Sequence, residues 1–222
     1  MTDLTNIDLY HGVLPSHMKS DIWEEYARVV LQWLKPADYS ELTLDDKPDL
    51  VDAISDLGVE VTWSLPEGSK KIDALYLRLC IEENSEKRRN IEERLSQLGA
   101  KVDKYVCLHP TGHDSFSLIN KSHKAKLELL NKGGYKLFKH NHLFIMSDIL
   151  ANETMLKSAL IEFERASAGY KNSFERIIVA VPEYVYEFNL VDHSYRVTEL
   201  PNSKQYDLAM TARGNVLNAE MS

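Results

Sequence analysis

One alternating segment limits the fold of this chain more than any other feature. From residue 59 to residue 65, every second residue is apolar: Val59, Val61, Trp63 and Leu65. The residues between them are polar: Glu60, Thr62 and Ser64. A period of two predicts a strand with one face on the core, so Glu60 lies on the opposite face with Thr62. A carboxylate flanked by valines is costly to bury, so the strand also predicts a cation or metal ion beside Glu60.

The rest of the chain alternates helical and strand-like patterns, which predicts an α/β fold. Apolar residues at helical spacing predict helices over residues 21–34, 70–98, 115–131 and 153–166. Strands are expected as a meander within 39–65, at 102–108, 142–146 and 174–181, and as a hairpin over 184–200. Residues 177–181 are continuously apolar, as in a strand buried on both faces, but the strand meander near the front of the chain favours a mixed sheet over an all-parallel one.

The 222 residues fit one domain, which we expect to span residues 1–200, followed by a polar, loosely ordered tail over 201–222. No apolar run is long enough to span a membrane, and the N-terminus lacks a basic segment followed by an apolar one, so we expect a cytoplasmic protein. The phosphate-binding GK[ST] and GxGxxG patterns are absent, as is a nucleophile-elbow sequence. These absences argue against P-loop, dinucleotide and acyl-transfer chemistry.

Two carboxylates are separated by the length of a hairpin. Asp49 follows Pro48, and Glu60 follows the turn expected at residues 55–58. Such a hairpin can bring both carboxylates within reach of one Mg²⁺ or Mn²⁺ ion, because these ions prefer oxygen ligands. The backbone carbonyl of Val61 is a further candidate ligand. The simpler alternatives are that Asp49 forms a turn or cap and that Glu60 pairs with a lysine at the start of the next helix.

Pro48-Asp49 followed by Glu60-Val61-Thr62 on a strand behind a helix resembles the PD-(D/E)XK nuclease superfamily. The sequence segment PDLVD…GVEVT is similar to that of a group of uncharacterised bacterial members with an EVT-type signature. Over residues 20–190, the resemblance implies a restriction-endonuclease-like, three-layer α/β/α domain with a central mixed sheet. It also implies a Mg²⁺- or Mn²⁺-dependent nuclease that binds nucleic acid, with DNA favoured over RNA, and that forms a homodimer.

In this family the helix before the hairpin often contributes a glutamate to the metal site. The predicted helix 21–34 offers Glu24 and Glu25. Glu25 lies next to the apolar line of the helix, so it is favoured as a ligand together with Asp49, Glu60 and Val61. The simpler alternative for Glu25 is a solvated side chain on the surface of the helix.

The departure from the family is Thr62, which stands where the family carries a lysine. That lysine supplies positive charge in the transition state, and threonine supplies only a hydrogen bond. Lys70 and Lys71, at the start of the next helix, can replace it. The other candidates are Lys121, Lys124 and Lys126, and the sequence does not choose between them.

The net charge of −8 argues against a surface coated for nucleic acid. Locally, however, residues 121–142 contain six lysines and a single acid, Glu128. Lys121, Lys124 and Lys126 are therefore candidate nucleic-acid contacts, with a solvated helix face as the alternative. Two further functions stay open: an inactive nuclease-like module that binds nucleic acid or a protein, and a regulatory protein that uses its acidic surface.

Overall fold

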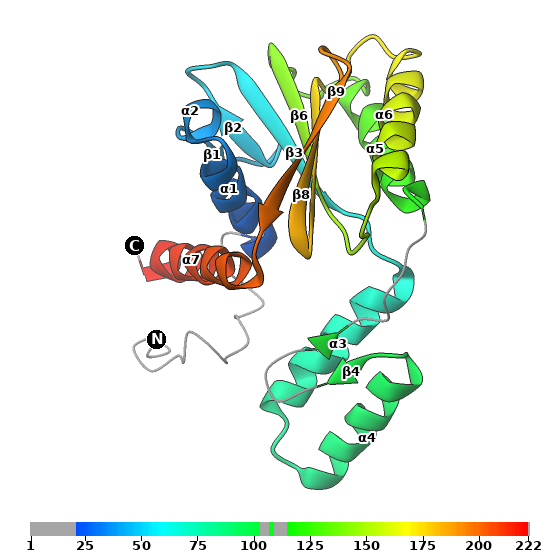
Figure 1. Cartoon of the computed structure of the whole chain (residues 1–222). Helices are drawn as coiled ribbons and strands as arrows, with labels where there is room; N and C mark the ends of the chain where they lie inside the picture. Colours follow the sequence, from blue (N-terminus) through cyan, green and yellow to red (C-terminus); the bar gives the residue numbers. More distant parts are fainter. Residues whose placement is uncertain (1–20, 103–106, 109–114, 222) are drawn as a thin grey trace. The chain divides into compact units, whose positions relative to one another are not determined.

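The computed structural model describes residues 21–102, 107–108 and 115–221. Within this part the protein is α/β, with seven helices and a seven-stranded mixed sheet (Figure 1). In place of the single domain expected over residues 1–200, the chain contacts divide the described residues into two units. The smaller comprises 65–102 with 107–108, and the larger comprises 21–64 with 115–221.

The larger unit opens with the predicted helix and strand meander, both of which are confirmed. Asp21 caps the first helix by accepting a hydrogen bond from the Trp23 N–H at 2.7 Å, and the helix ends before Pro36. The three strands that follow pair in an antiparallel manner. In order, these elements are α1 (Ile22–Leu34), α2 (Pro36–Tyr39), β1 (Thr43–Leu44), β2 (Leu50–Asp52) and β3 (Leu57–Trp63).

The strand order in the sheet is β1-β2-β3-β6-β7-β8-β9. The central strands β3, β6 and β7 run parallel, and the flanking pairs are antiparallel. The mixed sheet predicted from the sequence is therefore confirmed. The remaining strands are β6 (His140–Met146), β7 (Arg176–Val181), β8 (Glu183–Asn189) and β9 (Ser194–Leu200).

Helices pack on both faces of this sheet (Figure 1). On one face, α1, α2 and α7 (Asn202–Met221) form a core with the apolar side of β3. On the other face, α5 (Ser117–Leu130) and α6 (Glu153–Ser167) pack on β6, β7 and β8. Glu60 pairs in register with Leu143, which belongs to the α5–α6 core, so Glu60 faces α5.

Residues 202–221 differ from the loosely ordered, polar tail expected over 201–222, because they form the helix α7. Leu208, Ala212 and Val216 follow one another at intervals of four residues and are buried. A four-residue interval keeps side chains on one side of a helix, and α7 packs that side against α1. None of the helices in the described part of the chain is long and apolar enough to cross a membrane.

In the smaller unit, the single helix expected over residues 70–98 is two helices, α3 (Glu67–Ile81) and α4 (Ser85–Gln97). Asn84 separates them by capping α4, since its side-chain oxygen accepts from the N–H groups of Glu86 and Lys87. Such a cap has extended backbone and ends a continuous helix. Of the strand expected over 102–108, β4 (Lys101–Val102) and β5 (Cys107–Leu108) pair, and residues 103–106 lie outside the described part.

Candidate functional site

The β2–β3 hairpin draws Pro48 and Asp49 against the middle of β3. Leu50 pairs with Val59, so the residues before Leu50 run beside those that follow Val59. Gly58 makes the approach possible, because a Cβ atom there would lie 2.7 Å from Cγ of Pro48 and 2.8 Å from Cδ2 of Phe138. Real Cβ atoms do not come that close to other atoms, so a side chain at position 58 would displace one of its neighbours.

Asp49 is bound to the edge of β3. Its Oδ2 accepts a hydrogen bond from the Val61 N–H at 2.6 Å. In a strand the N–H and C=O of one residue point to the same neighbour, so the Val61 carbonyl also faces the edge where Asp49 lies. Burial raises the pKa of Asp49, the Val61 N–H opposes that rise, and Asp21 adds to it.

Glu60 is buried, with 5% of its surface exposed, and both of its oxygens have a donor. The Lys126 ammonium forms an ion pair with Oε2, and the Tyr135 hydroxyl donates to Oε1. Burial raises the pKa of Glu60, the Lys126 ammonium lowers it, and the charge of Asp49 raises it again. The sequence leaves the partner of Glu60 open between a metal ion and a basic side chain, with a lysine at the start of the next helix as the simple pairing. Among the described side chains, the partner is Lys126 of α5.

Among the candidate lysines whose side chains the structure describes, Lys126 pairs with the strand glutamate. It comes from α5, and its side chain is 20% exposed. Thr62 lies two residues after Glu60 on the same strand and is half-buried. Lys121 and Lys124 are exposed and project from the opposite side of α5, because five- and two-residue intervals turn a helix away from Lys126.

The other two candidates, Lys70 and Lys71, belong to α3 in the smaller unit. Lys71 is exposed there, and the side chain of Lys70 lies outside the described part of the chain.

On α1, the glutamate whose pKa is raised by burial and by the charge of Asp49 is Glu24. The pKa of Glu24 is raised to about 7, mainly by burial and then by the charges of Asp49 and Asp21. Lys126 lowers the same pKa, so Glu24 shares the electrostatic surroundings of Asp49 and Glu60.

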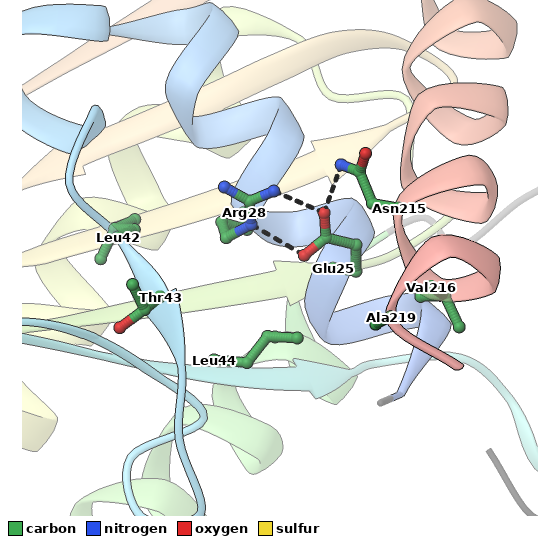
Figure 2. Close-up of a pocket in the computed structure, with 8 residues that line it drawn as sticks. All are labelled: Glu25, Arg28, Leu42, Thr43, Leu44, Asn215, Val216 and Ala219. Carbon is green, nitrogen blue, oxygen red and sulfur yellow. Dashed lines mark hydrogen bonds and ion pairs between the residues drawn. The ribbon is translucent and has the colours of Figure 1, made fainter. Parts of the chain in front are cut away.

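Glu25, which the sequence favoured, instead points towards α7 (Figure 2). It is 2% exposed and accepts two hydrogen bonds from Arg28, at 2.5 and 2.7 Å. Asn215 of α7 donates a third at 2.6 Å. These residues line a pocket of about 280 Å³ beside β1. With its oxygens engaged by Arg28 and Asn215, Glu25 serves to join α1 to α7, and the α1 position in the candidate site passes to Glu24.

Burial raises the pKa values of Glu24, Asp49 and Glu60, the Lys126 ammonium lowers each of them in turn, and it contacts Glu60 directly. Within the described residues, no three His, Cys, Asp or Glu side chains converge closely enough to hold a metal ion. The carboxylates of Glu24, Asp49 and Glu60 thus share one electrostatic neighbourhood without forming a closed ligand set, and Glu60 is neutralised by Lys126.

Tyr135 is a site residue that no motif or periodicity in the sequence indicates. It lies in the segment between α5 and β6, which has no periodicity, and it meets a glutamate 75 positions earlier in the chain. No spacing in the sequence signals an interaction of that kind.

Comparisons of the chain with models of protein families, with curated proteins and with solved structures found no match.

Proposed function

We propose that this protein is a Mg²⁺- or Mn²⁺-dependent nuclease with a restriction-endonuclease-like, three-layer α/β/α fold, acting on DNA. The observation that carries the proposal is the ion pair between Lys126 and Glu60, beside Asp49. It supplies a lysine to a strand that lacks one at Thr62. Two carboxylates and a lysine at adjoining positions are the chemical groups that metal-assisted phosphodiester hydrolysis requires.

The donors are of the kind that a hard divalent cation prefers, although the described carboxylates do not converge into a ligand set in this structure. Glu24, Asp49 and Glu60 offer carboxylate oxygens, and the Val61 carbonyl faces the same edge as Asp49. Burial and mutual repulsion raise the pKa values of these carboxyl groups, so bringing a cation among them relieves an electrostatic cost. When bound there, the ion would lower the pKa of the attacking water and stabilise charge on the phosphate.

The chain's own residues then have distinct roles. Asp49 is held in place by the Val61 N–H, which fixes one carboxylate oxygen towards β3. Glu60 is oriented by Lys126 and Tyr135 until substrate arrives. The Lys126 ammonium, partly exposed, can exchange the Glu60 oxygen for a phosphate oxygen and so stabilise the negative charge that develops there.

A cleavage assay on labelled DNA with MgCl₂ or MnCl₂ tests the proposal. We expect cleavage by the wild type that EDTA stops, and a loss of about 100-fold or more in Glu60→Gln, since removal of one group from a preorganised charged site has effects of that size. Glu128→Gln, an exposed glutamate on α5, is the matched control and should retain activity. Cleavage by Glu60→Gln at the wild-type rate would show that the activity belongs to another site or another protein.

One observation favours a second candidate, an inactive nuclease-like module that binds nucleic acid. Both oxygens of Glu60 are engaged by the protein's own donors, and the described carboxylates form no closed ligand set. Calorimetric titration with MnCl₂ separates the two functions. A nuclease should bind Mn²⁺ and lose that binding in Glu60→Gln, whereas DNA binding with no Mn²⁺ binding would favour the module.

A further inference from the structure

The segment that joins α5 to β6 borders the proposed site and is strongly basic. We call residues 131–139 the α5–β6 loop. It contains three lysines, Lys132, Lys136 and Lys139, and no acidic residue. We infer that this loop binds the sugar–phosphate backbone of the nucleic acid that enters the site. The inference rests on the proposed nuclease function.

Two contacts fix the loop against the hairpin that carries the carboxylates. The Tyr135 hydroxyl, near the middle of the loop, donates to Glu60. The Phe138 ring lies against Gly58, where the absence of a side chain makes room for it. A strand lying on this loop would therefore have its phosphates within reach of Glu60 and Lys126.

Hydrogen bonds anchor the loop at both ends. At its start, Asn131 donates to the Asn172 carbonyl at 2.8 Å and accepts from the Asn172 N–H at 2.9 Å. At its end, Asn141 donates to the Phe138 carbonyl at 2.7 Å. A loop already held in place loses little conformational entropy when it binds a ligand, which favours its use as a binding surface.

The lysines of the loop are available to phosphate. Lys132 and Lys139 are exposed, and neither has a carboxylate partner among the described residues. Lys136 is 61% exposed; its ammonium lies 4.6 Å from the centre of the Phe138 ring and 3.8 Å from Asp45. On a chain with a net charge of −8, a basic and acid-free loop beside the carboxylates is a distinct attractor for a polyanion.

The outer face of α5 is the competing surface, because the sequence favoured Lys121 and Lys124 there. These two lysines project from the side of α5 opposite Lys126, and Glu128 adds a negative charge to the helix. A nucleic acid lying along them would keep its phosphates away from Glu60. The α5–β6 loop is both positively charged and close to Glu60, so it fits a nucleic acid whose phosphates reach the proposed site.

The test measures how DNA affinity depends on salt in two double variants that each remove two positive charges. Lys132→Gln/Lys139→Gln alters the loop, and Lys121→Gln/Lys124→Gln is the matched control on α5. The probe is a fluorescein-labelled DNA duplex, followed by fluorescence anisotropy in EDTA, so that no cleavage occurs. Affinity is compared between about 50 and 200 mM KCl, the range over which counterion release changes it strongly.

We expect the slope of log affinity against log salt to become shallower by about 2 in the loop variant, because each lysine that no longer neutralises a phosphate reduces the slope by about 1. The slope should stay unchanged in the control. A wild-type slope in the loop variant, or an equal reduction in the control, would overturn the inference. If either result is found while cleavage still depends on Lys126, the proposed nuclease function stands and only the role of the α5–β6 loop in binding is rejected. A wild type that binds no DNA would overturn both.

Discussion

Glu60 owes its place in a buried strand to two donors. The Lys126 ammonium contacts one oxygen and the Tyr135 hydroxyl the other. Removing a carboxylate from water costs several kcal/mol unless its charge is matched and its oxygens are hydrogen-bonded. The same two donors therefore contribute to the stability of the hairpin and set the charge state of the proposed site.

Lys126→Met should lower the free energy of unfolding by about 2 to 4 kcal/mol, because it leaves a buried carboxylate without its counter-charge. Urea denaturation at neutral pH in EDTA measures the change. Lys124→Met, two residues away on the exposed side of α5, should stay within about 0.5 kcal/mol of the wild type. Equal effects in the two variants would mean that Lys126 has no special role in the fold.

Glu24 should make the metal-free protein less stable as the pH rises. Its pKa is about 7 in the folded protein against an ordinary value of 4.5, so between these values the folded state binds more protons than the unfolded state. The free energy of unfolding therefore falls as the pH rises from about 4.5 to about 7. Glu24→Gln should reduce this slope in denaturation curves recorded in EDTA. An unchanged slope would place the charge of Glu24 in solvent, away from Asp49.

Among the site residues, the sequence was most informative about Asp49 and Glu60. Their separation by one hairpin, and the alternation around Glu60, are local properties that a strand must obey. The choice between Glu24 and Glu25 depended on where α7 packs, and that helix was not expected. The choice of Lys126 depended on the pairing of β3 with β6, which sets where α5 lies.

At the scale of elements, local signals in the sequence correctly predicted where the helix α1 begins and ends. Asp21 and Pro36 mark the limits of α1, since one side chain caps the first turn and the ring of the other ends the helix. The break between α3 and α4 was missed because Asn84 lies in a charged stretch whose helical pattern continues on both sides. α7 was missed because Gly214 and many polar residues weaken its propensity, so packing against α1 stabilises it instead.

If packing against α1 stabilises α7, a buried leucine on α7 should matter to the whole larger unit. Leu208, 5% exposed, packs in the core shared with α1, so Leu208→Ala should cost about 2 to 4 kcal/mol of stability. Tyr206, on the same helix and 53% exposed, provides the control, and Tyr206→Ala should cost much less. Thermal or urea unfolding measures both. If Leu208→Ala is as mild as Tyr206→Ala, α7 contributes little to the larger unit.

Helix α5 contains a buried histidine that should make the fold sensitive to acid. His123 is fully buried against Phe163, neither ring nitrogen has a hydrogen-bond partner among the described residues, and burial lowers its pKa to about 4. Below pH 6.5, the ordinary pKa of histidine, His123 binds a proton in the unfolded state but stays neutral in the folded state until the pH approaches 4. Stability from this residue is therefore present above about pH 6.5 and lost as the pH falls towards 4.

His123→Leu should remove that loss, so the variant should gain stability relative to the wild type as the pH falls from 6.5 to 4. The contributions of Glu24 and His123 oppose each other over much of this range. Each is measured as the difference between the single variant and the wild type across a pH series. A constant difference between His123→Leu and the wild type would contradict the buried neutral imidazole.

At the scale of the whole molecule, the sequence predicted the class of the fold but not its topology. Alternating strands and helices, with one continuously apolar strand, were enough for an α/β protein with a mixed sheet. The parallel pairing of β3 with β6 joins residues about 80 positions apart, and no local pattern encodes it. The division into two units has the same origin, because it follows from which distant segments contact one another.

The distribution of charge over the whole chain also bears on the proposed function. A net charge of −8 repels nucleic acid at a distance, so binding must rely on a local basic surface and on acidic groups neutralised at the site. The pairing of Lys126 with Glu60 and the acid-free α5–β6 loop provide these two features at adjoining places.

The role of Lys126 is most directly tested by moving the lysine. Metal-dependent DNA cleavage is compared among the wild type, Lys126→Met, and the double variant Lys126→Met/Thr62→Lys, which returns a lysine to β3 two residues after Glu60. If Lys126 supplies the charge that Thr62 lacks, the single variant loses cleavage by about 100-fold or more and the double variant regains a measurable part of it. Cleavage by Lys126→Met at the wild-type rate would contradict the assignment of this lysine to the proposed site.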